Sequence, residues 1–94
     1  MLSMESARLR ITGRVQGVGY RAWAIDTAAR LGLRGWVRNR RDGSVEALVT
    51  GDEDAVAAMI EACRDGPFAA RVTEVHVSDA ADDGSDRFRP LATV

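Results

Sequence analysis

The chain has 94 residues, enough for one domain with a modest core. Its net charge of −1, with all 13 basic residues arginine, gives no bulk attraction to nucleic acid or to an anionic membrane. One cysteine excludes an internal disulfide, and neither it nor the one histidine belongs to a cluster of metal ligands. We therefore expect a single domain over residues 1–94 with a flexible tail over residues 1–6. Without a signal peptide or an apolar run of spanning length, we also expect a cytoplasmic location.

The first half of the chain predicts a strand, a helix and a hairpin. Apolar and polar residues alternate over residues 7–15, as in a half-buried strand. The period becomes helical over residues 21–31, and Gly32 follows as a typical C-terminal glycine. Two further strands are predicted over residues 34–40 and 44–50. A tight turn at residues 41–43 joins them, because its Asp-Gly pair tolerates positive φ.

The second half predicts a second helix and two more strands. Asp52 is the expected N-cap of the helix, which Gly66 and Pro67 end. A fourth strand is predicted over residues 71–79, an acidic loop over residues 79–86 and a short edge strand over residues 88–91. The order β-α-β-β-α-β predicts an α+β, ferredoxin-like split βαβ fold. Its antiparallel sheet would carry both helices on one face and leave the other face open to solvent.

The most informative segment is GRVQGVGYR, residues 13–21. Glycines allow successive N–H groups to point into one concavity, and a helix N-terminus adds free N–H groups and a partial positive charge. Arg21 stands where the helix begins, and its planar fork of donors matches phosphate oxygens. The segment is therefore typical of a cradle for a small dianion. A plain strand-to-helix turn is the alternative, and the residues of the loop alone leave both open.

The expected topology brings a second residue to this cradle. A strand–helix–strand unit is a right-handed crossover, so the first two strands run parallel and end at the same edge of the sheet. Asn39 lies near the end of the second strand, on the same face as the apolar Val37. We expect its side chain to point toward the cradle beside Arg21. Asparagine is also common at the mouth of a hairpin, which is the plainer interpretation of Asn39.

Three segments of the chain resemble the acylphosphatase family. Residues 13–21 resemble its signature GxVQGVxFR, with Tyr20 in place of the common Phe. Residues 35–46, GWVRNRRDGSVE, resemble its second signature, GWVxNxxDGxVE. Residues 66–72, GPFAARV, resemble GPPxARV, with Phe68 where a second Pro is common. The resemblance spans nearly the whole chain. It implies a ferredoxin-like fold and hydrolysis of acyl phosphates to carboxylate and phosphate, with no metal or cofactor.

The same resemblance implies the residues of the site. The catalytic arginine and asparagine of the family fall on Arg21 and Asn39. The phosphate-binding backbone amides fall on Gln16, Gly17, Val18, Gly19 and Tyr20. We expect a monomer whose partner is a small acyl phosphate, with no nucleic acid or membrane partner.

Two other functions are alternatives to hydrolysis. RNA-recognition domains use the open face of a similar sheet and stack bases on aromatic residues of its two central strands. Here several arginines surround Trp36, but the outward positions of the central strands hold no aromatic residue. We therefore expect Trp36 to lie under arginine side chains, with His76 facing solvent. A non-catalytic module that binds acyl or carbamoyl phosphate is the closer alternative, which Asn39 disfavours because a pure binder has no need to orient water. The role of Trp23 stays open.

Overall fold

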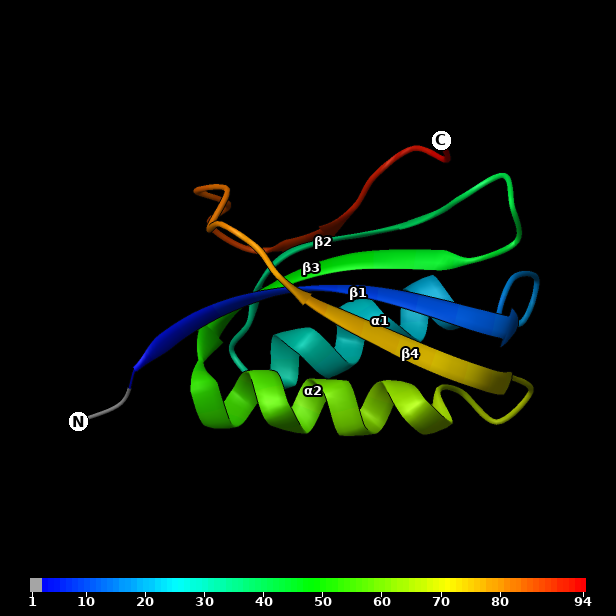
Figure 1. Ribbon diagram of the computed structural model, residues 1–94, viewed down its shortest axis with the longest axis horizontal. Coiled ribbons are helices and arrows are strands. Elements are labelled where there is room, and N and C mark those ends of the chain that lie inside the picture. The colour runs from blue at the N-terminus through cyan, green and yellow to red at the C-terminus, as the bar shows by residue number, and fades with distance from the viewer. Residues whose placement is uncertain (1–2) are drawn as a thin grey trace.

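The computed structural model describes residues 3–94 as one sheet covered on one face by two helices (Figure 1). In chain order the elements are β1 (Met4–Arg14), α1 (Tyr20–Arg30), β2 (Arg34–Asn39), β3 (Val45–Asp52), α2 (Glu53–Asp65), β4 (Arg71–Asp79) and β5 (Phe88–Pro90). The strands lie in the order β4-β1-β3-β2-β5. The predicted α+β, ferredoxin-like split βαβ arrangement is confirmed.

β1 begins earlier than the sequence pattern predicted. Residues 4–6, expected in a flexible tail, pair with residues 50–52 of β3. Glu53 also donates its amide to the carbonyl of Ser3 at 2.9 Å. Because alternation marks only the half-buried part of a strand, it gives no signal for the exposed residues at the start of β1. Residues 1 and 2 of the expected tail lie outside the described residues.

We expected an antiparallel sheet, but one pair of neighbouring strands is parallel. β5 pairs in parallel with β2, with Gly35 opposite Phe88 and Val37 opposite Pro90. The pairing is parallel because β4 runs opposite to β1, so the loop after β4 brings the chain to the end of the sheet where β2 begins. Pro90 has no N–H to donate and lies on the edge strand, as predicted.

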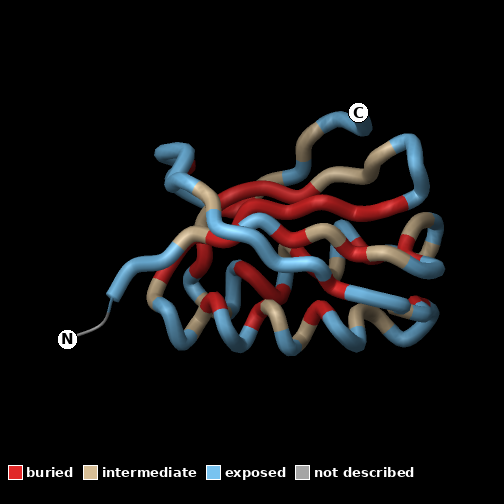
Figure 2. Tube along the Cα trace, viewed as in Figure 1, coloured by how far each residue is buried: buried red, intermediate tan, exposed pale blue. Residues whose placement is uncertain are grey.

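The core lies between the sheet and the helices (Figure 2). The apolar residues that alternate toward the helices in the three inner strands are buried: Leu9, Ile11, Val37, Val45, Ala47 and Val49. Asn39, predicted on the same face as Val37, is half-buried. α1 meets them with the small side chains of Ala24 and Ala28, and α2 with Val56, Met59 and Cys63. Complete burial of one large aliphatic side chain stabilises the fold by roughly 1.5–3 kcal/mol, so this layer fixes the register of the sheet against α1.

The three residues predicted at helix ends lie where they were expected, but one of them makes no capping hydrogen bond. Gly32 has a φ of 71° just after α1, and Gly66 is the residue at which α2 ends. Asp52 occupies the N-cap position of α2, but its side chain makes no capping hydrogen bond. Asp52 also pairs with Met4 as the last residue of β3, so its backbone is shared between strand and helix. Within the described residues, neither helix is long and apolar enough to cross a membrane.

The sheet face opposite the helices is exposed along β4, as expected, but over β3 it is covered. Glu46, Leu48 and Thr50, the outward positions of β3, are all buried. Trp36 is buried beside them, with the guanidinium of Arg38 4.6 Å from its ring centroid. The predicted cover of Trp36 by an arginine is therefore confirmed. Strand alternation identifies the direction of a side chain, but not the long neighbours that fold across it.

Glu46 is the carboxylate at the centre of this covered face. Its Oε1 accepts hydrogen bonds from Nε of Arg38 at 2.8 Å and from Nη1 of Arg40 at 2.9 Å. Nε of Arg8 lies 3.4 Å from its Oε2. Burial raises the pKa of Glu46, but the hydrogen bonds from Arg38 and Arg40 outweigh burial, and the pKa lies below its ordinary value.

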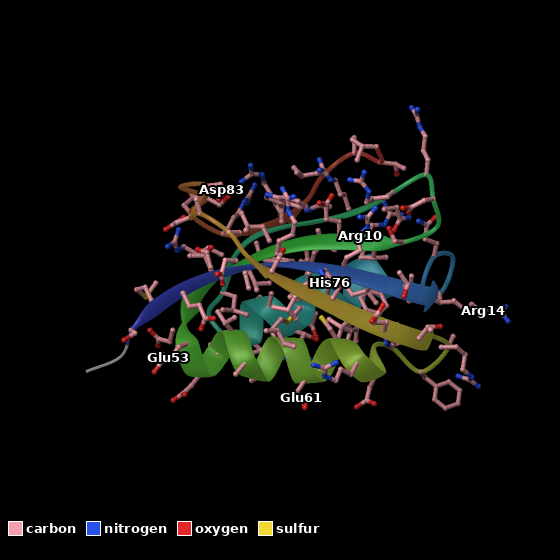
Figure 3. All side chains as sticks on the ribbon, viewed as in Figure 1. Arg10, Arg14, Glu53, Glu61, His76 and Asp83 are labelled. Atoms are coloured by element: carbon pink, nitrogen blue, oxygen red, sulfur yellow. The ribbon has the colours of Figure 1, made fainter. Side chains whose placement is uncertain are left out.

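Arg10 of β1 lies opposite Glu46 on the same face of the sheet (Figure 3). Arg10 donates to Asp42 at 2.8 Å and to Ser44 at 3.1 Å. His76, opposite Arg10 in the neighbouring strand, is exposed as expected. Arg14 ends β1 and points away from the body of the protein (Figure 3). Arg10 therefore connects this face of the sheet to the turn between β2 and β3.

We expect Glu46→Gln to lower the free energy of unfolding at pH 7 by about 2 kcal/mol, because charged hydrogen bonds contribute roughly 1.5–3 kcal/mol. The folded state lowers the pKa of Glu46, so its stabilisation is present above the ordinary carboxyl pKa, about 4.3, and is lost as the pH falls. Urea denaturation at pH 7 and pH 3 measures this. Glu74→Gln, at an exposed position of β4, is the control. Equal losses for Glu46→Gln at both pH values would contradict the assignment.

Candidate active site

The segment between β1 and α1 is shaped by two glycines. Gly17 and Gly19 have φ angles of 73° and 80°, in the left-handed region where an L side chain is strained. A Cβ added at either position would meet no atom within 4 Å. Backbone conformation therefore requires these glycines, and close packing does not. Gly19 is the N-cap of α1, and its carbonyl accepts the first helical hydrogen bond from the amide of Trp23 at 3.0 Å.

The backbone amides of residues 16–20 are uncommitted donors. Within residues 3–94, none of them donates a hydrogen bond to a protein acceptor. The amides at the start of α1 add further free donors, as at any helix N-terminus. Free amides in a glycine-rich loop together with the positive end of a helix dipole favour an anion in front of them.

A pocket of about 320 Å³ opens beside the loop and brings Arg21 of α1 and Asn39 of β2 together. Its lining residues are Val15, Gln16, Gly17, Gly19, Tyr20, Arg21, Ala22, Ile25, Asn39 and Pro90. Val18, an expected amide donor, does not line this pocket, and its side chain packs against the core. The parallel course of β1 and β2 places Arg21 and Asn39 at the same end of the sheet, as the crossover geometry predicted.

The side chain of Gln16 connects the loop to the hairpin that follows β2. Its Nε2 donates to the carbonyl of Arg40 at 2.7 Å and to the carbonyl of Ser44 at 2.8 Å. Arg40 directly follows Asn39, so this one amide group ties the loop to the strand end that carries Asn39. The sequence pattern predicted a role for the backbone amide of Gln16 and did not indicate this role of its side chain. The only signal in the sequence was a long amide side chain in a loop otherwise built from glycine and valine.

The hairpin itself is held by a carboxylate. Within this turn only Gly43 has a positive φ, which is 95°, and Asp42 is not in the left-handed region. Instead, Oδ1 of Asp42 accepts from the Ser44 amide at 2.9 Å and from the Ser44 hydroxyl at 2.6 Å. These donors, with Arg10, hold the pKa of Asp42 at about 2. The turn beside Asn39 is therefore fixed by an Asp42 side chain that stays ionised at neutral pH.

The backbone of Asn39 is also held from the outer side of β2. Leu91 donates its amide to the carbonyl of Val37 at 2.9 Å, and Val94 donates its amide to the carbonyl of Asn39 at 3.3 Å. The amide of Arg41 in turn donates to the carbonyl of Val94 at 2.7 Å. Asn39 thus lies between two supports, with Gln16 on the loop side and residues 91–94 on the edge side.

Tyr20 is a structural part of the site. Its hydroxyl donates to the carbonyl of Cys63 at 2.6 Å, and both residues are buried. If α2 continued, the Cys63 carbonyl would accept a hydrogen bond from the amide of residue 67. Pro67 has no N–H, so the Tyr20 hydroxyl takes the place of that helical donor. Burial raises the pKa of Tyr20 and raises that of Cys63 to about 11. Trp23 packs edge to face against Tyr20, with ring centroids 5.2 Å apart, and does not line the pocket.

Arg21 and Asn39 are the pocket residues with free polar side chains. Of the other polar lining residues, Gln16 is bonded to the hairpin and Tyr20 to Cys63. Neither Arg21 nor Asn39 makes a side-chain hydrogen bond or ion pair with another residue of the described chain. Arg21 is also the only charged residue in the lining. The arrangement can hold a small oxyanion and offer an amide oxygen to a neighbouring water molecule.

Comparison with known proteins identifies relatives over almost the whole chain. The family model described as acylphosphatase matches residues 7–90. An acylphosphatase of Rhodopseudomonas palustris (strain BisB5) is 52% identical over 99% of this chain and 100% of its own length. An acylphosphatase of Azorhizobium caulinodans is 55% identical over 96% of this chain and 98% of its own. Among solved structures, the acylphosphatase of Bacillus subtilis is 37% identical and superposes with a TM-score of 0.89, over 95% of this chain and 99% of its own.

We expect Gln16→Met to lower the free energy of unfolding by about 1–2 kcal/mol, because two hydrogen bonds to backbone carbonyls are lost while the volume is kept. Gln16→Glu should be worse at neutral pH, because a carboxylate would face the carbonyls of Arg40 and Ser44. Its protonated form regains a donor, so the Glu variant should recover relative to the Met variant as the pH falls. Urea denaturation at pH 7 and pH 4 compares them. A Glu variant as stable as wild type at pH 7 would show that the contact is unimportant.

Proposed function

Because this chain belongs to the acylphosphatase family and is a hydrolase that acts on acyl phosphates, we propose that Arg21, Asn39 and the loop amides of residues 16–20 are its catalytic apparatus. The observation that carries the proposal is that Arg21 and Asn39 share one pocket and are its two side chains with free polar groups. Because Arg21, Asn39 and the loop belong to the same chain, the proposed site is complete within one subunit.

The loop amides and Arg21 bind the phosphoryl group of the substrate. The amides of Gln16, Gly17, Val18, Gly19 and Tyr20 donate to its non-bridging oxygens. The guanidinium of Arg21 donates to two oxygens at once, since its planar fork matches their spacing. Charge on these oxygens changes as the phosphoryl group is transferred, and donors already fixed in place stabilise it without reorganisation.

The chemistry of the leaving group explains why so few functional groups suffice. An acyl phosphate is a mixed anhydride that releases a carboxylate, whose conjugate acid has a pKa of roughly 4 to 5. This group leaves without a proton, so the reaction needs no general acid. Binding and orientation are therefore the tasks left to the protein.

Asn39 positions the attacking water. Its side-chain carbonyl accepts a hydrogen bond from the water and holds the water oxygen in line with the bond that breaks. The oxygen bonds to phosphorus while the bond from phosphorus to the bridging oxygen breaks, and the carboxylate leaves with that oxygen. A proton of the water passes to a phosphate oxygen, because the pocket offers no side-chain base.

We expect Arg21→Lys to lower kcat/KM for benzoyl phosphate at least about a hundredfold, as for the loss of an oxyanion donor. The ammonium keeps the charge but loses the planar fork. Steady-state hydrolysis in EDTA measures the effect and at the same time tests for a required metal. Arg30→Lys, on the exposed last turn of the same helix, is the matched control. Near-full activity of Arg21→Lys would rule out the bidentate role.

We expect Asn39→Ala to lower kcat about a hundredfold with a smaller change in KM, because the water loses its position while the phosphoryl group keeps its donors. Inorganic phosphate should still inhibit the residual activity competitively. An unchanged kcat would leave Asn39 as a turn residue. A folded wild-type protein that binds phosphate and releases no carboxylate would favour the alternative, a non-catalytic acyl or carbamoyl phosphate-binding module.

A further inference from the structure

The two ends of this protein carry opposite charge. β1 and β2 end, and β4 begins, at the end of the sheet that carries the glycine loop. The opposite end holds eight of the 14 acidic residues, together with three arginines. The acids are Glu5, Asp52, Glu53, Asp54, Asp79, Asp82, Asp83 and Asp86, and the arginines are Arg30, Arg34 and Arg87. Figure 3 labels Glu53 and Asp83 at this acidic end and Arg14 at the end with the loop.

The end with the loop is positive because four of its arginines have no acidic partner. These are Arg14 at the end of β1, Arg21 in α1, Arg41 in the β2–β3 turn and Arg71 at the start of β4. All four are exposed, and within residues 3–94 none of them forms an ion pair. Asp42 in the same turn is already paired with Arg10 at 2.8 Å. Asp65 and Glu74 are then left against four positive charges.

Three of these arginines lie outside the pocket but close to its mouth. Arg14 directly precedes Val15, and Arg41 follows Asn39 by two residues; Val15 and Asn39 line the pocket. Arg71 pairs with Arg14 across β4 and β1. Two residues of chain span at most about 7 Å, and charges act over about 10 Å at 0.1 M salt. The molecule is 38 Å long, so the acidic end lies well beyond this range.

We propose that Arg14, Arg41 and Arg71 form a positively charged rim that attracts dianionic acyl phosphates from solution to the pocket. The inference rests on the proposed function, because it assumes that the phosphoryl group enters at the loop. Charge of one sign around a site raises the local concentration of the opposite ion and its rate of association. Because the three residues do not line the pocket, they act on capture of the substrate and leave the chemical step unchanged.

Screening explains how a chain with a net charge of −1 attracts an anion. A phosphoryl group carries nearly two negative charges at neutral pH. A dianion about 10 Å from two positive charges, in water at 0.1 M salt, is concentrated about threefold by Coulomb attraction. Repulsion from the acidic end is almost completely screened over the greater distance. At 1 M salt the Debye length falls to about 3 Å, and the attraction of the rim disappears with it.

The test compares kcat/KM for benzoyl phosphate in wild type and in the double variant Arg14→Gln/Arg41→Gln. Arg71 is left intact, because its guanidinium also donates to the carbonyl of Ala70 at 2.9 Å. We expect a ratio of wild type to variant of about three at 0.1 M salt and close to one at 1 M salt, with equal kcat. Salt anions that compete for the loop affect both proteins alike, so the ratio isolates the rim.

Two further double variants separate charge from structure. Arg14→Lys/Arg41→Lys keeps both charges and should match wild type at either salt concentration. Arg14→Glu/Arg41→Glu reverses them and should lower kcat/KM about ninefold at 0.1 M salt, the square of the effect of removal.

Arg87→Gln is the matched control, because Arg87 is an exposed arginine of the acidic end and has no ion pair within the described residues. It should match wild type throughout. The rim would be overturned by a Gln variant equal to wild type at 0.1 M salt, by a deficit that persists at 1 M salt, or by a Lys variant as impaired as the Gln variant. Wild-type protein that hydrolyses no acyl phosphate would instead overturn the proposed function, so the two failures are distinguishable.

Discussion

The relative position of the glycine loop and Asn39 depends on two hydrogen bonds from one side-chain amide. Gln16 donates to the carbonyls of Arg40 and Ser44, on either side of the β2–β3 turn. β1 and β2 are not neighbours in the sheet, because β3 lies between them. The loop that leaves β1 therefore reaches the end of β2 through side-chain contacts and not through a shared strand ladder. Asp42 and residues 91–94 fix the turn and the outer side of β2, and Gln16 joins that rigid unit to the loop.

This support matters because the proposed chemistry depends on position more than on acid–base strength. A reaction with a good leaving group needs a held phosphoryl group and a water molecule in line with it, and small displacements of either are costly. The pocket contains no carboxylate, imidazole or thiol that could be tuned as a base. The two groups with strongly raised pKa values, Tyr20 and Cys63, are buried in the core behind the loop, where the Tyr20 hydroxyl donates to the backbone carbonyl of Cys63. Tyr20 and Cys63 therefore have a structural role, and the free polar side chains of the pocket are the guanidinium of Arg21 and the neutral amide of Asn39.

The sequence was sufficient for the element order, the inward faces of the inner strands and the meeting of Arg21 with Asn39, because alternation, helical period and crossover handedness are local or topological properties. It was insufficient wherever long side chains from different strands meet. Glu46 occupies an outward position, and only the folded sheet shows that Arg8, Arg38 and Arg40 bury it. The contact between Tyr20 and the Cys63 carbonyl joins two helices in the same way. A carbonyl four residues before Pro67 was a signal that some donor had to reach it, but the sequence does not say which one.

The surroundings of Cys63 have a consequence for an enzyme that handles activated acyl groups. Mixed anhydrides of carboxylic and phosphoric acid acylate amines and thiolates, so an unprotected nucleophile near the pocket would be modified by the substrate itself. All 13 basic residues of this chain are arginine, and no side-chain amine is therefore present. Cys63 is buried, and its pKa of about 11 keeps it as the unreactive thiol at neutral pH. The chain is thereby protected against self-acylation at the two side-chain types that react most readily.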